Sequence, residues 1–138
     1  MRSLNVYLSG ATKNVDKEFQ NWRNRYMEFF DINLNFIDPI RYFNYTDKKP
    51  KTNKQCLDLF MWQIDNSDVL LVNLDYSEVS IGTAMEVEHA YCNNIPIIAF
   101  GEKDETWYSW IVERASVIFD SLEEALCYID DYYYASTI

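Results

Sequence analysis

The sequence predicts one α/β domain, residues 1–138, in which a parallel sheet of five strands lies between two layers of helices. Short apolar runs alternate with amphipathic stretches along the whole chain, which is the order of strand–helix–strand units. One run, Val69–Val72, is apolar at every position, as expected of a central parallel strand that helices cover on both faces. A length of 138 residues also suits a single domain with a core of its own.

The first half of the chain is expected to hold two strands and two helices. A strand over Leu4–Leu8 is followed by a helix over Asp16–Phe30, whose apolar residues recur at helical spacing. A second strand, Leu34–Ile37, ends before a proline, and residues 40–53 form a polar, aromatic loop long enough to indicate a role at a site. The second helix is expected over Lys54–Asn66.

The second half adds three strands and three helices. The strands are expected over Val69–Val72, Ile95–Phe100 and Val117–Phe119. The helices are expected from the loop at 75–83 to about Asn93, over Thr106–Arg114, and after the capping residue Ser121. Right-handed crossovers between five such strands favour a three-layer, flavodoxin-like (Rossmann-like) sheet with the strand order 2-1-3-4-5.

The composition argues against several classes of function. With 12 basic and 22 acidic residues the formal net charge is −10, so no nucleic acid polymer is expected as a partner. No apolar stretch approaches the ~18 residues of a membrane span, so no membrane partner is expected. Three cysteines without a CxxC pair are expected to be reduced thiols of a cytoplasmic protein, and a single histidine argues against structural zinc.

The polar residues gather where the expected strands end. In a parallel sheet of this kind the ligand binds beyond the carboxyl ends of the strands. Those ends are Ser9-Gly10, Asp38-Pro39, residues 73–83 and Gly101 onward. The Ser9-Gly10 pair fits a backbone that approaches a phosphate, and it fits a simple tight turn equally well. The later glycines of a GxGxxG fingerprint are absent, so an NAD-binding domain is a poor interpretation.

The segment Ser80–Glu86 is the most informative one. Gly82 and Thr83 open a helix at the point where the strand order reverses, and free amides there, with the hydroxyls of Ser80 and Thr83, can hold an anion or a sugar hydroxyl. Glu86 follows about one helical turn later among apolar neighbours. It is either a carboxylate in a cleft, suited to attack on a glycosidic carbon, or a solvent-facing helix residue.

Three other features have a structural and a functional interpretation. Tyr7 is either a core residue or a ring that lines the pocket beside Ser9. His89 is expected to be a packed or surface histidine, since no second Glu-x-x-His pair is present to complete a metal site. The run Tyr132–Tyr134 indicates an aromatic patch for packing, within the chain or between subunits.

Three segments, Val6–Gly10, Asn66–Val72 and Ser80–Tyr91, resemble the nucleoside 2-deoxyribosyltransferase family, whose superfamily includes 2'-deoxynucleoside 5'-monophosphate N-glycosidases and CMP hydrolases. The resemblance spans nearly the whole chain, and Gly82–Glu86 is its most specific part. It implies a flavodoxin-like fold, a homo-oligomer, no metal and no cofactor. It also implies cleavage or transfer at the N-glycosidic bond of a small-molecule nucleoside or nucleotide.

The resemblance implies roles for single residues as well. Glu86 matches the family nucleophile, which attacks the sugar C1' and forms a covalent glycosyl-enzyme, and Tyr7 matches the tyrosine that assists it. Ser80 stands where nucleoside-using members place an aspartate, whereas nucleotide-using members have a serine, which can donate to a phosphate. Ser109 resembles a serine that reaches the 5'-phosphate of a neighbouring subunit. The residues expected to hold the phosphate and sugar are Ser9, Gly10, Ser80, Gly82, Thr83 and Ser109.

Phe60 departs from the family pattern. The family usually has an aspartate eight residues before the one that opens the third strand, which is Asp68 here, and that aspartate helps to handle the leaving base. Phe60 cannot exchange a proton, and neither Asp58 nor Asp65 shares its helical face. The departure implies that another acid acts, that activity is weak, or that the protein binds without catalysis.

Two functions therefore compete, and a third is weaker. The first is a nucleoside deoxyribosyltransferase or nucleotide N-glycosidase that acts through Glu86, with hydrolysis and transfer both open. The alternative is a catalytically weak or inactive protein that binds or sequesters a nucleotide, which Phe60 favours. The third is a purely structural oligomer built through the tyrosine-rich C-terminus.

Overall fold

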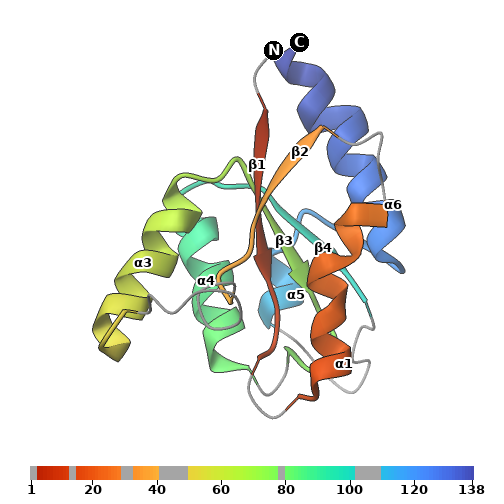
Figure 1. Cartoon of the computed structure of the whole chain (residues 1–138). Helices are drawn as coiled ribbons and strands as arrows, with labels where there is room; N and C mark the ends of the chain where they lie inside the picture. Colours follow the sequence, from red (N-terminus) through yellow and green to blue (C-terminus); the bar gives the residue numbers. More distant parts are fainter. Residues whose placement is uncertain (1–2, 13–14, 29–32, 41–49, 78–79, 102–109) are drawn as a thin grey trace.

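Five parallel strands form one sheet in the order β2-β1-β3-β4-β5, which confirms the order predicted from the sequence (Figure 1). The computed structural model describes residues 3–12, 15–28, 33–40, 50–77, 80–101 and 110–138. The strands are β1 (Leu4–Ser9), β2 (Leu34–Ile37), β3 (Val69–Asn73), β4 (Ile97–Phe100) and β5 (Val117–Phe119). The central strand β3 is buried along its whole length, as a run of apolar residues between two helical layers should be.

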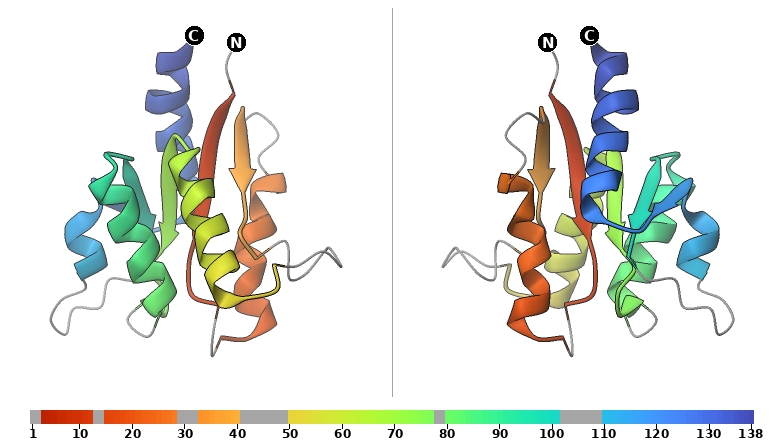
Figure 2. Two further views of the ribbon diagram at one scale, coloured as in Figure 1. Left: turned by 90° about the vertical axis from the view of Figure 1, so that its left-hand side faces the viewer. Right: turned by 90° about the vertical axis from the view of Figure 1, so that its right-hand side faces the viewer.

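Helices cover both faces of the sheet (Figure 2). On one face lie α3 (Asn53–Asp65), α4 (Ile81–Cys92) and α5 (Trp110–Arg114). On the other lie α1 (Lys17–Gln20) with the 3₁₀-helix η1 (Asn21–Glu28), and α6 (Leu122–Tyr128) with the π-helix η3 (Ile129–Tyr134) and the 3₁₀-helix η4 (Ala135–Thr137). Side chains that accept hydrogen bonds from amides of the first turn fix four helix starts: Asp16, Thr52, Ser80 and Ser121.

The two apolar cores follow from the alternation of side chains along the strands. Val6 and Leu8 of β1 face the layer of η1 and α6, where they pack with Trp22. Tyr7, between them, faces the layer of α3 and α4 and packs there with Leu70 of β3. The alternation therefore sends the side chain of Tyr7 toward the helix that carries Glu86.

Several predicted boundaries differ from those observed. The predicted helix over Asp16–Phe30 is one turn of α-helix followed by 3₁₀-helix to Glu28. The strand predicted from Ile95 begins at Ile97, shortly after a turn in which Asn94 has a φ of 60°. Most of the predicted loop at 40–53 and the first part of the predicted helix at 106–114 lie outside the described residues.

The tyrosine-rich end packs mainly inside the chain. Tyr134 is buried in the core, and Tyr133 packs against it, so packing within the chain is confirmed for these two residues. Tyr132 is exposed and its ring contacts that of Tyr128. The three cysteines are free. Within the described ranges, no helix combines the length and the apolar character needed to cross a membrane.

Candidate active site

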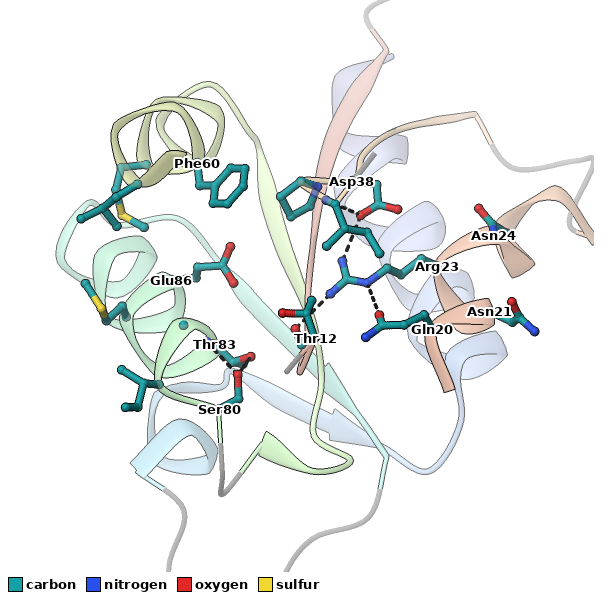
Figure 3. Close-up of a pocket in the computed structure, with 18 of the residues that line it drawn as sticks. Thr12, Gln20, Asn21, Arg23, Asn24, Asp38, Phe60, Ser80, Thr83 and Glu86 are labelled. Carbon is teal, nitrogen blue, oxygen red and sulfur yellow. Dashed lines mark hydrogen bonds and ion pairs between the residues drawn. The ribbon is translucent and has the colours of Figure 1, made fainter. Parts of the chain in front are cut away.

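A cleft of about 1020 Å³ lies at the carboxyl end of the sheet, between the two helical layers (Figure 3). One wall is apolar and comes from α3 and α4, and the other is polar and comes from α1, η1 and the end of β2. The apolar wall is formed by Leu57, Phe60, Met61, Ile81 and Met85. The polar wall includes Lys17, Gln20, Asn21, Arg23, Asn24 and Asp38.

The carboxylate of Glu86 lies in this cleft and is held by two hydroxyl groups of β1. The phenol of Tyr7 donates to Oε2, and Ser9 Oγ donates to Oε1 at 3.0 Å. Tyr7 and Ser9 are two positions apart on one strand, so both side chains point to the face on which α4 packs. The helical start at Ser80 then brings Glu86, on the second turn of α4, against them. Of the two interpretations of Glu86, a carboxylate in a cleft and a solvent-facing helix residue, the structure agrees with the first.

Burial dominates the electrostatics of this group. The pKa of Glu86 is raised from 4.5 to about 6, and loss of solvent is the largest cause. The hydrogen bonds from Tyr7 and Ser9 and the positive charge of Arg23 lower that pKa, whereas the negative charge of Asp38 raises it. The pKa of Tyr7 is raised far above its usual value, first by burial and then by the carboxylate of Glu86. Tyr7 therefore remains a neutral donor at neutral pH and does not act as a base.

Arg23 is a central residue of the cleft that the sequence analysis missed. It is 2% exposed, and its guanidinium donates to four acceptors. Nη1 donates to the carbonyl of Leu8 and to Oδ1 of Asp38, each at 3.0 Å. Nη2 donates to the carbonyl of Gly10 at 2.9 Å, and Nε donates to Oε1 of Gln20 at 3.0 Å. A signal was present, because Arg23 follows Phe19 by four residues and so falls on the apolar stripe of its helix.

The start of α4 lies at the other end of the cleft. Ser80 Oγ accepts from the amide of Thr83 at 3.2 Å and lies 2.7 Å from the hydroxyl of Thr83. Gly82 faces open space, since a Cβ built there meets nothing within 4 Å. A Cβ on Gly10, in contrast, would lie 2.8 Å from the indole of Trp22, so packing against that ring requires the glycine. The structure therefore brings Ser80, Gly82 and Thr83 into the same cleft as Glu86.

The acids near Phe60 do not replace the expected aspartate. Phe60 lines the cleft, as the family resemblance implies for that position (Figure 3). Asp58 is exposed and pairs with Lys54 at 2.8 Å, and Asp65 lies 2.7 Å from the imidazole of His89, away from the cleft lining. The hypothesis that either of them serves the site is not supported by their positions. Among the described residues, Asp38 is the other carboxylate that lines the cleft.

Two further expectations concern residues around the site. Ser109 lies outside the described residues, so its expected contact with a phosphate stays a prediction. His89 is half-buried at the surface and pairs with Asp65, as the structural interpretation of that histidine holds. In the part of the chain that the structure describes, no group of three or more His, Cys, Asp or Glu side chains is placed to hold a metal ion.

Solved structures of other proteins share this fold. A 2-deoxyribosyltransferase from Bacillus psychrosaccharolyticus aligns with 96% of this chain and 94% of its own length, with a TM-score of 0.67 and 15% sequence identity. A conserved protein from Enterococcus faecalis V583 aligns with 94% of this chain and 99% of its own, with a TM-score of 0.72 and 16% identity. No family model and no curated protein matches the sequence. The chain therefore has the fold of a 2-deoxyribosyltransferase over nearly its whole length.

Proposed function

We propose that this protein cleaves or transfers at the N-glycosidic bond of a nucleoside or nucleoside 5'-monophosphate, with Glu86 as the nucleophile. The observation that carries the proposal is the buried carboxylate of Glu86, which lies in a cleft with a neutral phenol on one oxygen and a hydroxyl on the other. A carboxylate so placed suits attack on an anomeric carbon. The fold is shared with a 2-deoxyribosyltransferase described as a biocatalyst for nucleoside synthesis.

The proposed chemistry has two steps. In the first, a carboxylate oxygen of Glu86 bonds to C1' of the sugar while the C1'–N bond breaks, and the base leaves with that electron pair and takes a proton from solvent. In the second, water or the N–H of another base attacks C1', releases the carboxylate and loses one proton. Water gives hydrolysis, and a second base gives transfer. Tyr7 and Ser9 orient the carboxylate through both steps by donating to its oxygens.

A 5'-monophosphate fits the start of α4 better than a bare 5'-hydroxyl. Ser80 and Thr83 offer two hydroxyls beside the amides of the first helical turn, where the helix dipole favours negative charge. An aspartate at position 80 would repel a phosphate, and serine removes that repulsion. The apolar wall of the cleft, with Phe60, offers a surface on which a base can stack.

The alternative is a protein that binds a nucleotide with little or no turnover, and Phe60 is the observation that favours it. Protonation of the leaving base by a positioned acid typically contributes 10²–10⁴-fold to such reactions. Phe60 supplies no proton, and Asp38 is held by Arg23 in an ion pair. We therefore expect slow cleavage, and the alternative is the limit in which cleavage vanishes while binding remains.

Incubation with a panel of ribo- and deoxyribonucleosides and their 5'-monophosphates tests the proposal, with free base separated and quantified by chromatography. Wild type is expected to release base from at least one member, and Glu86→Gln is expected to release it at least ~100-fold more slowly, which is about 2.7 kcal/mol in barrier. Glu88→Gln, on the same helix and paired with Arg114 outside the cleft, is the matched control. Base release by Glu86→Gln at the wild-type rate would refute the proposal. Ligand-dependent rise in melting temperature without release would favour the binding alternative.

A further inference from the structure

Arg23 is a buried cation whose hydrogen bonds join the end of β1 to α1 and to the residue after β2. A charge out of contact with water is costly unless it is paired and its donors are satisfied. Here the pair is Asp38, and the remaining donors reach a side-chain amide and two backbone carbonyls. Such an arrangement fixes the relative positions of η1, the end of β2 and the end of β1.

The sheet itself explains why these carbonyls need Arg23. Strand β2 ends at Ile37, which pairs with Tyr7, so among the described residues no strand lies beside β1 on that edge from Leu8 onward. The carbonyls of Leu8 and Gly10 face that edge. The guanidinium of Arg23 donates to both of them, as the amides of a neighbouring strand would. Ser9 lies between these two carbonyls, and its own hydroxyl donates to Glu86.

We propose that Arg23 is the positioning residue of the Glu86 site: its guanidinium holds the end of β1 so that Tyr7 and Ser9 meet the carboxylate, and together with Asp38 it balances the charge there. The inference rests on the proposed function, since positioning matters for catalysis only if Glu86 reacts. Arg23 acts through Tyr7, Ser9 and the local field. No contact with the reacting atoms is assigned to it.

The charged and titratable groups that face Glu86 predict the direction in which its pKa should change when one of them is removed. Tyr7 faces it from β1, Arg23 from η1 and Asp38 from the end of β2, while α3 presents the uncharged Phe60. The positive charge of Arg23 favours the ionised carboxylate, and the negative charge of Asp38 disfavours it. Removal of either charge should therefore move the titration of Glu86, and the two removals should move it in opposite directions.

A titration that needs no turnover tests the inference. Protein labelled with ¹³C at glutamate carboxyls is titrated by NMR, and Glu86→Gln identifies the signal of Glu86. We expect Arg23→Met to raise the midpoint by at least about half a pH unit and Asp38→Asn to lower it. Arg25→Met removes a neighbouring arginine that pairs with Glu123 at the surface, and it is expected to leave the midpoint unchanged.

Arg23→Lys separates the effect of the positive charge from the effect of the hydrogen bonds. Lysine keeps the charge but lacks the planar guanidinium that donates to two carbonyls. We expect the Glu86 midpoint to stay near the wild-type value while kcat for base release falls at least ~10-fold with little change in KM. If Arg23→Met does not fold, the expected decrease of the Glu86 midpoint in Asp38→Asn becomes the deciding measurement.

Midpoints in Arg23→Met and Asp38→Asn equal to that of Arg25→Met would overturn the inference, as would full kcat in Arg23→Lys. If the midpoints move as expected while wild type releases no base from any nucleotide, the proposed function fails and the control of Glu86 by Arg23 stands. The two failures are therefore distinguishable.

Discussion

At the scale of single residues, Glu86 links the chemistry of the cleft to the stability of the chain. Its pKa is about 6 in the folded protein against 4.5 for an ordinary glutamate. A carboxyl that holds its proton more tightly when folded contributes stability below the lower value, and this contribution is lost as pH rises through the higher one. The shift corresponds to roughly 2 kcal/mol. The folded protein is thus expected to be less stable when Glu86 is ionised, which is its reactive form, than when Glu86 is protonated.

The pH dependence of the Glu86→Gln variant measures that cost. Because Gln does not titrate, its free energy of unfolding relative to wild type should rise by roughly 2 kcal/mol between about pH 4 and about pH 7. Urea denaturation of both proteins at several pH values measures the difference. Glu88→Gln serves as the control, since Glu88 lies at the surface in an ion pair with Arg114. A difference that stays constant with pH would contradict a buried, ionised Glu86.

Phe60 decides between a slow enzyme and a binder. It occupies the position at which the family resemblance expects an aspartate, and it lines the cleft. Phe60→Asp is expected to raise the rate of base release at least ~10-fold, because a carboxyl there can protonate the leaving base. Leu57→Asp places the same group one turn earlier on the same wall and is expected to give no gain. Rapid turnover by wild type that Phe60→Asp slows would show that no acid is missing.

At the scale of elements, the start of α4 is expected to select for a phosphate. In wild type, nucleoside 5'-monophosphates should raise the melting temperature more than the matching nucleosides do. Ser80→Asp should reverse this order, because aspartate repels the phosphate while it still caps the helix. Ser121→Asp makes the same change at the cap of α6 on the opposite face and should leave the order unchanged. Equal shifts for both ligands in wild type would remove the 5'-monophosphate from the proposed function.

The two glycines of the cleft should respond differently to an added methyl group. Gly10→Ala pushes a Cβ to 2.8 Å from the ring of Trp22, which is expected to cost about 1–3 kcal/mol of stability. Gly82→Ala meets no atom within 4 Å and removes a glycine from α4, so stability should hold or rise by up to about 1 kcal/mol. Thermal unfolding compares the two variants. Destabilisation of Gly82→Ala as large as that of Gly10→Ala would contradict the open space beside α4.

At the scale of the whole molecule, the sheet was predictable because each strand is an apolar run and the chain rules leave few ways to connect five of them. The residues at which helices and strands begin and end were less predictable. The helical stripe from Phe19 predicts a helix but not its change to 3₁₀ geometry at Asn21, which depends on how η1 packs against the core. Strand β4 begins two residues after its predicted start, beyond the turn at Asn94, whose φ is positive; the pair Asn93-Asn94 signals that turn in the sequence, but it does not fix the residue at which the strand begins.

The site was partly predictable for similar reasons. Tyr7, Ser9 and Glu86 could be named because strand ends and helix starts are visible in the sequence, and the structure brings all three together. Arg23 could have been singled out because it falls on the apolar stripe of its helix, whereas its pairing with Asp38 could not, because a buried ion pair between segments 15 residues apart leaves no local pattern.

The central claim is that the carboxylate of Glu86 bonds to the sugar, and one measurement tests it directly. Wild type is mixed with the substrate that the panel identifies, quenched in acid during turnover and analysed by intact-protein and peptide mass spectrometry. We expect an added mass equal to the glycosyl group of that substrate, with its 5'-phosphate if the substrate is a nucleotide, on the peptide that contains Glu86, and no such mass in Glu86→Gln. Base release by wild type with the added mass on a different residue, or with an equal added mass in Glu86→Gln, would contradict the claim.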